Sequence, residues 1–239
     1  MKPKKLNIQH DRVDKIYHVA DIHFRNVTRH EEYREVLNKF FADIIRKGTE
    51  NSIIIIAGDV AHSKVETSPE LSREMSWLFT ECTRLTDTIL IPGNHDLNLN
   101  NKGRLDAISP IVDNLKNKRL HYLHDNGLYK CKNILFSHYG ILSDVEDFIT
   151  YDKIPTTYLN EVDTTIALFH GPMDSAKTDV GYEVSNKAIT KSLFEGFDMA
   201  IFGDIHKHQC LYADEKIVDE DEFEDYMNTG EWEAIEQVD

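Results

Sequence analysis

Five segments of the sequence carry side chains that bind metal ions, and each follows a short apolar run. They are Asp21-Ile22-His23, Gly58-Asp59, Gly93-Asn94-His95-Asp96, His170-Gly171 and Gly203-Asp204-Ile205-His206. Carboxylates, imidazoles and one amide suit manganese, iron, magnesium or zinc, and a set without thiolates disfavours a structural zinc site. Residues i and i+2 of an extended segment point to the same side, so Asp21 and His23 can share one ion.

The number of candidate ligands points to more than one ion. Seven side chains qualify: Asp21, His23, Asp59, Asn94, His170, Asp204 and His206. Two ions roughly 3.5–4 Å apart, bridged by a carboxylate, would use them all, and that arrangement hydrolyses phosphate esters. Two divalent ions outweigh the charge of three aspartates, so the site would still attract a phosphodiester anion. We expect hydrolysis by a hydroxide that the two ions activate.

The elements around these residues would bring them together. Apolar runs predict strands at 15–20, 53–57, 88–91, 133–137, 164–169 and 198–202, and a 3.6-residue period predicts helices across 36–45, ending at Gly48, and across 71–85. Alternating strands and helices indicate an α/β fold. Sites in such folds form at the carboxyl ends of the strands, so ligands that are distant in sequence can converge on one edge.

The charge of the chain is concentrated at its end. Of the formal charge of −15, residues 214–239 contribute −11, from 12 acidic residues and one lysine, which leaves −4 for residues 1–213. The body is therefore no basic nucleic-acid clamp. We expect residues 214–239 to be an acidic tail or the start of an insertion.

Composition excludes other classes. With 41% apolar residues the chain can build one core, and its longest apolar runs fall far short of the ~20 residues that span a membrane. Residues 1–11 lack the apolar stretch of a secretory signal, so we expect a cytoplasmic protein. The three cysteines are widely spaced and are expected to be ordinary thiols.

The ligand series resembles that of the calcineurin-like metallophosphoesterase superfamily over roughly residues 15–210. The segment Gly58-Asp59-Val60-Ala61-His62, with Ser68-Pro69 downstream and the loop from His170-Gly171-Pro172, is most similar to the SbcD-type DNA repair nucleases, including virus-encoded members. The resemblance implies a four-layer α-β-β-α sandwich. It also implies Mn²⁺ as the preferred metal, with Mg²⁺, Fe or Zn²⁺ as alternatives, and a role in DNA repair, recombination or replication.

The resemblance also assigns roles to residues. It places Asp21, His23, Asp59 and His206 on one ion, and Asp59, Asn94, His170 and Asp204 on the other, with Asp59 as the bridge. His95 would stabilise the transition state and protonate the leaving oxygen, and Asp96 beside it is a candidate orienting partner. For His62 two interpretations are open: it would help to place the scissile phosphate, or it would be a surface histidine. The other histidines are expected to be structural, and among them only His138 follows an apolar run.

The sequence departs from the family pattern at two places. Asp204 stands where the superfamily has a histidine after the glycine, and a carboxylate there favours harder ions such as Mn²⁺ or Mg²⁺. In an alternative register, His206 and His208 would form the His-x-His pair of the family, in place of Asp204 and His206. In the nucleases, further strands and a DNA-recognition domain follow the last motif. Here an acidic run follows, so the nuclease domain 1–213 is expected to lack its last strands, as a fragment or split product.

Three functions are consistent with these features. The first is a Mn²⁺-dependent nuclease acting on DNA with an SMC-like ATPase subunit, with a homodimer as a further expectation, in the cytoplasm of a bacterial cell or an infected host. The second is a phosphatase or phosphodiesterase acting on a nucleotide or a phosphoprotein, which needs no DNA-binding surface. The third is an inactive scaffold that keeps the fold.

Overall fold

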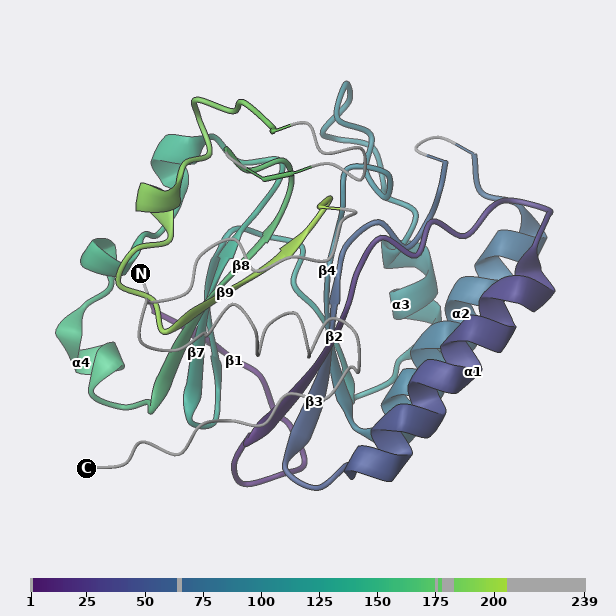
Figure 1. The fold of residues 1–239 in the computed structure, drawn as a ribbon, viewed down its shortest axis with the longest axis horizontal. Helices are drawn as coiled ribbons and strands as arrows, with labels where there is room; N and C mark the ends of the chain where they lie inside the picture. The colour runs from purple at the N-terminus through teal and green to yellow at the C-terminus, as the bar shows by residue number, and fades with distance from the viewer. Residues whose placement is uncertain (1, 64–65, 175, 178–182, 206–239) are drawn as a thin grey trace. The chain divides into compact units, whose positions relative to one another are not determined.

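The computed structural model describes residues 2–63, 66–174, 176–177 and 183–205. His206, the pair partner His208 and the acidic residues 214–239 lie outside this described part, as do any strands that follow residue 205. Within the described part, the strands form two sheets (Figure 1). No helix among the described residues is both long enough and apolar enough to cross a membrane.

The first sheet has the strand order β2-β3-β4-β5 and is parallel throughout. Its strands are β2 Lys15–Val19, β3 Ser52–Ala57, β4 Asp87–Ile91 and β5 Leu120–Tyr122. The second sheet has the order β1-β6-β7-β8-β9, with β6 and β7 antiparallel and its other neighbours parallel. Its strands are β1 Lys4–Lys5, β6 Gly127–Cys131, β7 Ile134–Tyr139, β8 Thr164–His170 and β9 Met199–Gly203.

Strand β3 shows why the sheets face each other. All six of its residues are buried, as expected of a parallel strand that is covered on both sides. Ile53, Ile55 and Ala57 belong to the core between the two sheets, whereas the alternate residues Ile54 and Ile56 belong to the core under the helices. A run of apolar residues thus serves two cores, one on each face.

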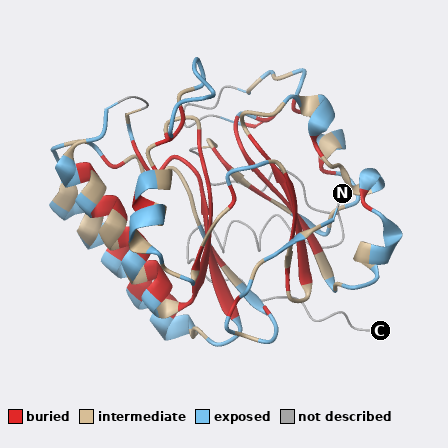
Figure 2. Cartoon of the chain, turned by 180° about the vertical axis from the view of Figure 1, so that it is seen from behind, coloured by how far each residue is buried: buried red, intermediate tan, exposed pale blue. Residues whose placement is uncertain are grey.

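Three helices cover the outer face of the first sheet (Figures 1 and 2): α1 His30–Lys47, α2 Pro69–Leu85 and α3 Ser109–Leu115. Ser68 begins α2, because its Oγ accepts a hydrogen bond of 3.0 Å from the amide of Leu71 and Pro69 occupies the first turn. Helix α1 ends at Gly48, whose φ of 92° suits glycine. Helix α1 begins six residues before its predicted stripe and ends two residues after it, and α2 begins two residues before its stripe.

Short helices cover the outer face of the second sheet. They are the 3₁₀ turns η1 Val145–Asp147, η2 Tyr151–Lys153 and η3 Lys191–Leu193 and the single-turn helix α4 Thr156–Leu159. In this layer Ile154 packs with Leu128 and Leu135 of the sheet. The order is helix, sheet, sheet, helix, which confirms the expected sandwich. Strands β1, β5 and β6 were not predicted, because they are short or lie next to turns.

Candidate metal centre

The carboxyl ends of strands from both sheets meet at one edge. Asp21 and His23 follow β2, Asp59 follows β3, and Asp204 follows β9. Two hydrogen bonds join the sheets there: the amide of Asp204 donates to the Asp21 carboxylate at 3.0 and 3.1 Å, and Asn94 Nδ2 donates to Asp204 Oδ1 at 3.2 Å. The predicted convergence of distant residues on one edge is therefore seen directly.

The first ligand group consists of Asp21, His23 and Asp59. Their ligand atoms all lie within 4.8 Å of one another. His23 Nε2 is 3.6 Å from Asp59 Oδ2 and 4.0 Å from Asp21 Oδ1. Two carboxylates and one imidazole around a common point form an incomplete shell for a divalent cation. His206, the fourth ligand expected here, lies outside the described residues.

The second ligand group consists of Asp59, His170 and Asp204, again with ligand atoms within 4.8 Å. His170 Nε2 is 3.3 Å from Asp59 Oδ1, and its Nδ1 donates to the carbonyl of Ala57 at 2.7 Å. That backbone bond fixes the ring and leaves Nε2 as the atom that faces the group. Asp59 belongs to both groups, which is the position of a bridging carboxylate.

Buried polar atoms support metal binding. Among the described residues, Asp59 Oδ2, Asn94 Oδ1 and His170 Nε2 are buried without a hydrogen bond of good geometry. Native proteins rarely leave such atoms unsatisfied, because each costs free energy that a partner would recover. All three are the oxygen or nitrogen atoms that would face an ion. The donor set therefore fits divalent metal ions.

The charges of Asp59 and His170 depend on each other. Burial would raise the pKa of Asp59, but the hydrogen bond and charge of His170 and the amide of His95, 2.7 Å from Oδ1, lower it below the ordinary value. Burial would lower the pKa of His170, and the neighbouring Asp59 instead raises it to about 9. Without an ion, a proton on His170 compensates the carboxylate, and a cation would take over that role.

The backbone at this edge adopts uncommon conformations. Asp21, His23, Asp59 and Asp204 have φ values of 56°, 51°, 53° and 70°, in the left-handed region. Only a few per cent of non-glycine residues adopt such values, and they concentrate at functional sites. Each residue turns the chain sharply off its strand and directs its side chain across the edge.

Three glycines let the strand ends approach closely. A Cβ on Gly93 would lie 2.2 Å from Asp59 Oδ1, and one on Gly58 or Gly203 would lie 2.3 Å from His170 Nδ1. Only Gly58 also has a positive φ, of 88°. Gly58 therefore permits a tight turn off its strand, whereas Gly93 and Gly203 are needed for close contact.

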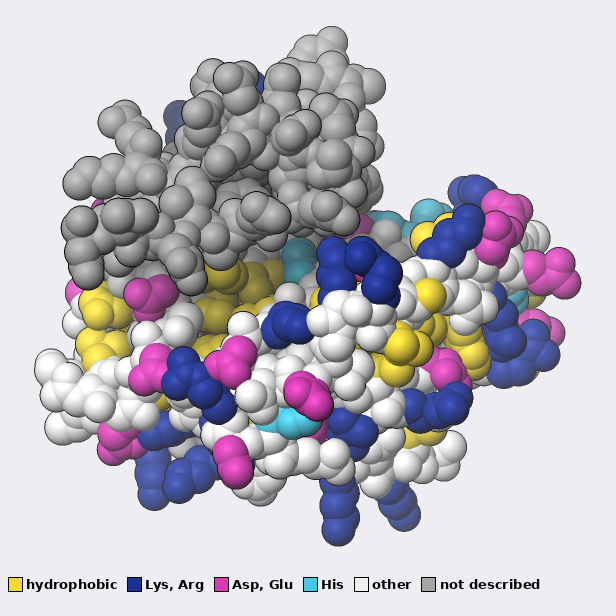
Figure 3. Space-filling model, turned by 60° about the horizontal axis from the view of Figure 1, so that its bottom comes forward, with side chains coloured by type: hydrophobic (Ala, Val, Ile, Leu, Met, Phe, Trp, Pro, Cys, Tyr) yellow, Lys and Arg dark blue, Asp and Glu magenta, His cyan; other side chains and the backbone are white. Residues whose placement is uncertain are grey.

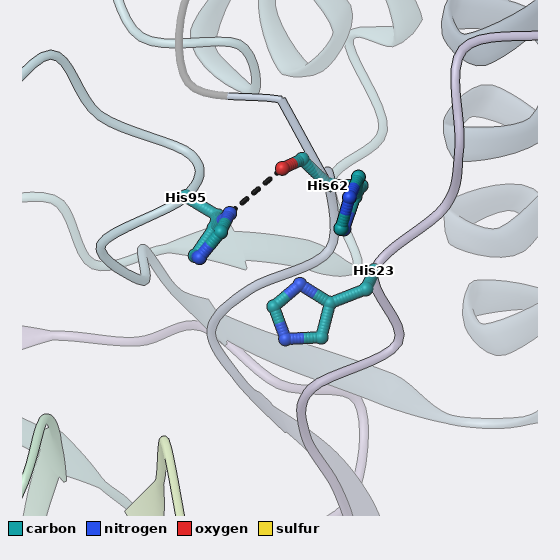
Figure 4. A group of neighbouring side chains, drawn as sticks. All are labelled: His23, His62 and His95. Atoms are coloured by element: carbon teal, nitrogen blue, oxygen red, sulfur yellow. Dashed lines mark hydrogen bonds between the residues drawn. The ribbon is translucent and has the colours of Figure 1, made fainter.

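Two further histidines lie beside the first ligand group (Figure 4). The His95 ring is 4.8 Å from the His23 ring, centroid to centroid, and 5.8 Å from the His62 ring, on which it is stacked. His95 Nδ1 donates to the backbone carbonyl of His62 at 2.7 Å. His62 is exposed and His95 half-buried. Both rings are therefore held at the open side of the group.

Asp96 binds backbone amides and not the ring of His95, the partner expected from the sequence. Its buried carboxylate accepts hydrogen bonds from the amides of Ala61 and Gly93 at 2.8 Å and of Val60 at 3.3 Å. Burial raises the pKa of this carboxyl to about 6 despite these amides. The His62 carbonyl, not Asp96, holds the His95 ring. Asp96 instead ties the loops after β3 and β4 together, and so positions Asp59.

His138 lies apart from the ligand groups. Its side chain is buried in β7, and Nδ1 donates to the carbonyl of Asp125 at 2.9 Å. Burial lowers the pKa of His138 to about 4. The apolar run before it therefore marked a core position.

A pocket that the sequence did not reveal opens next to the second ligand group. Its volume is about 360 Å³, and Asn94 and His170 form part of its lining together with apolar side chains. Because these apolar residues come from four separate segments, no local pattern could have indicated them.

Comparison with known proteins agrees with this geometry. The family model described as calcineurin-like phosphoesterase matches residues 14–208. A relative from Acanthamoeba polyphaga mimivirus, described as uncharacterized protein R555, is 42% identical over 208 residues, covering 84% of this chain. The chain spans only 15% of that protein's length. The matched range contains both ligand groups and His95, and the chain belongs to the calcineurin-like phosphoesterase family, whose members hydrolyse phosphate esters with divalent metal ions.

Proposed function

We propose that the chain is a DNA nuclease that hydrolyses phosphodiester bonds with two divalent ions. The observation that carries the proposal is Asp59, a buried carboxylate shared by two ligand groups, with His95 and His62 at their open side. A shared carboxylate between two groups fits a two-ion site, and two-ion sites activate water against phosphate esters.

Each ligand group would hold one ion. Asp21, His23 and Asp59 would hold one, with His206 as the further ligand, and Asp59, Asn94, His170 and Asp204 the other. When bound, the ions supply Lewis-acid activation of the phosphate and of water. Four of the seven candidate ligands are oxygen donors and none is a thiolate, which supports Mn²⁺ or Mg²⁺ over Zn²⁺.

The protein's own contribution to the proton transfer comes from His95. Because its Nδ1 donates to the His62 carbonyl, its Nε2 is the nitrogen that faces the site, and in the imidazolium form Nε2 would give its proton to the leaving oxygen. The stacked ring of His62 is exposed beside it and would contact the phosphate. A second imidazole there adds a hydrogen-bond donor without a fixed charge, which suits a singly charged diester.

DNA as substrate is supported by the resemblance of the segment from Gly58 to His62 to that of SbcD-type nucleases. The net charge of −4 over residues 1–213 favours the alternative, hydrolysis of a small phosphodiester or a phosphoprotein. On the face in Figure 3, the Lys and Arg side chains of the described residues are interspersed with Asp and Glu and form no continuous basic stripe. Duplex DNA is held largely through such stripes.

We propose that a partner supplies a basic surface for DNA. An SMC-like ATPase subunit is the first candidate and a second copy of the chain is the other, in the cytoplasm of a bacterial cell or an infected host. The mimivirus relative is several times longer than this chain. A third candidate for the basic surface is therefore another part of the same polypeptide.

The test is cleavage of end-labelled single-stranded and duplex DNA in Mn²⁺, alongside hydrolysis of bis-p-nitrophenyl phosphate. The variant Asp59→Asn should lose both activities by about 100-fold or more, because it weakens both ligand groups. Asp113→Asn, an exposed carboxylate on α3, is the matched control and should change neither. DNA left intact while the small diester is hydrolysed would refute a nuclease that works without a partner. The chain would then act on another phosphate ester, or would cut DNA only with the partner that supplies the basic surface.

A further inference from the structure

The pocket beside the second ligand group differs chemically from the ligand edge. Asn94 and His170 line one side, and the rest is mostly apolar, including Leu99, Ile141, Phe148 and Phe169. No Lys, Arg, Asp or Glu belongs to the described lining. Binding pockets of this size are typically apolar with a few polar groups that fix orientation. The lining therefore suits a flat, uncharged group.

The walls of the pocket are held in place by neighbouring rings. Phe148 stacks on Tyr139 with centroids 4.5 Å apart and an interplanar angle of 12°. The ring of Phe169 lies 6.0 Å from that of Phe148, and both side chains are buried. The Tyr139 hydroxyl donates to the carbonyl of Leu193 at 2.6 Å. The aromatic wall is thus formed before any ligand binds, so binding would cost little ordering entropy.

The position of the pocket decides which part of a substrate would enter it. His170 belongs to the second ligand group, and Asn94 donates a hydrogen bond to Asp204 of that group. His23 of the first ligand group and its neighbours His62 and His95 do not line the pocket. A phosphodiester has one leaving group, which His95 would protonate, and one group that stays on the phosphorus. The group that stays is therefore the one directed toward the pocket.

We propose that this pocket binds the nucleoside that retains the phosphate, with its base over the exposed Leu99 and against the small parts of Phe148 and Phe169 that reach the pocket. This inference rests on the proposed function and extends it, because it states which of the two nucleosides beside the cleaved bond is bound: the one that carries the phosphate in the product. Bases stack on aromatic and apolar side chains without a fixed sequence preference. A phosphopeptide is disfavoured, since its charged neighbours would find no countercharge in this lining.

The test uses esters with the same leaving group. Thymidine 5′-(p-nitrophenyl phosphate), its 3′ isomer and methyl p-nitrophenyl phosphate all release p-nitrophenol, so they differ only in the group that stays. Stacking of one base typically changes affinity by about 5- to 140-fold. We expect kcat/KM for one thymidine ester to exceed that of the methyl ester by at least tenfold. Equal values for all three esters would overturn the proposal.

Matched variants locate the effect. Leu99 lines the pocket and is 40% exposed, and Leu105 is 74% exposed on the same loop but does not line the pocket. Leu99→Ser should reduce the ratio of thymidine to methyl ester hydrolysis by about fivefold, whereas Leu105→Ser should leave every rate unchanged. If Leu105→Ser changed the ratio as much as Leu99→Ser, the pocket would not be the cause.

A binding measurement separates this inference from the proposed function. Titration of thymidine monophosphate and of methyl phosphate into the Mn²⁺-loaded chain needs no turnover. Tighter binding of thymidine monophosphate, lost in Leu99→Ser, would support the pocket even if no ester were hydrolysed, and the nuclease proposal alone would fail. Equal binding of the two phosphates would overturn the pocket, even with DNA cleavage intact.

Discussion

Gly93→Ala tests whether close approach of the strand ends positions the shared carboxylate. The added Cβ would lie 2.2 Å from Asp59 Oδ1, 2.3 Å from Asp59 N and 2.8 Å from Asp59 Cγ. Gly93 is not among the residues with positive φ, so alanine meets no conformational penalty there. The whole effect would come from contact with Asp59.

The distances set the magnitude. Non-bonded carbon contacts need about 3.5 Å, so the strand end that carries Asp59 must move by about 1 Å. A shift of this size at a catalytic group costs about 100-fold in rate. Overpacking costs typically about 1–3 kcal/mol of stability, and since one contact is with a backbone nitrogen we expect the upper end, about 3 kcal/mol.

The assay is hydrolysis of bis-p-nitrophenyl phosphate in Mn²⁺, with the unfolding free energy measured in urea. Gly103→Ala is the matched control, because a Cβ there would meet only Asn101 Oδ1 at 3.8 Å. It should change neither quantity. If Gly93→Ala kept its rate within threefold and its stability within about 0.5 kcal/mol, the contact with Asp59 would not position the site.

Two more predictions concern stability, and one concerns the ions. The folded-state pKa of His138, about 4, lies below its unfolded value of about 6.5, so stability present above pH 6.5 is lost as the pH falls toward 4. Urea unfolding should show a loss of about 2 kcal/mol between pH 7 and pH 5, absent in His138→Asn. Glu74 is fully buried and accepts hydrogen bonds from Arg34 and Arg73, which are partly exposed, so Glu74→Ala leaves no buried charge behind and should cost about 1–3 kcal/mol by the same measurement. Chelation with EDTA should abolish hydrolysis and lower the melting temperature, and added Mn²⁺ should restore both.

Much of the site could be predicted because its chemistry lies in side chains. Asp21, Asp59, His170 and Asp204 follow apolar runs, and parallel strands bring their carboxyl ends to one edge whatever their separation in sequence. The fold followed from the same runs, since an entirely apolar β3 requires cover on both faces.

The remainder depends on contacts that no side-chain pattern encodes. His95 is oriented by a backbone carbonyl, and every residue has one, so the sequence could not indicate that of His62. Asp96 binds the amides of Val60 and Ala61, which come near it only after β3 and β4 lie side by side. The strands β1 and β5 have only two and three residues, too few to show a period.

The left-handed backbone at the ligand positions lowers the stability of the fold, while the side chains there serve the chemistry of the site. Four of the eight described non-glycine residues with positive φ are Asp21, His23, Asp59 and Asp204, and each such residue costs on the order of 1 kcal/mol relative to glycine. A selection for heat resistance alone would therefore favour glycine at these positions, above all at His23, whose side chain is bulkier than aspartate. Aspartate and histidine persist there only while hydrolysis is selected, so glycine at these positions in a relative would mark the loss of activity before the fold changed.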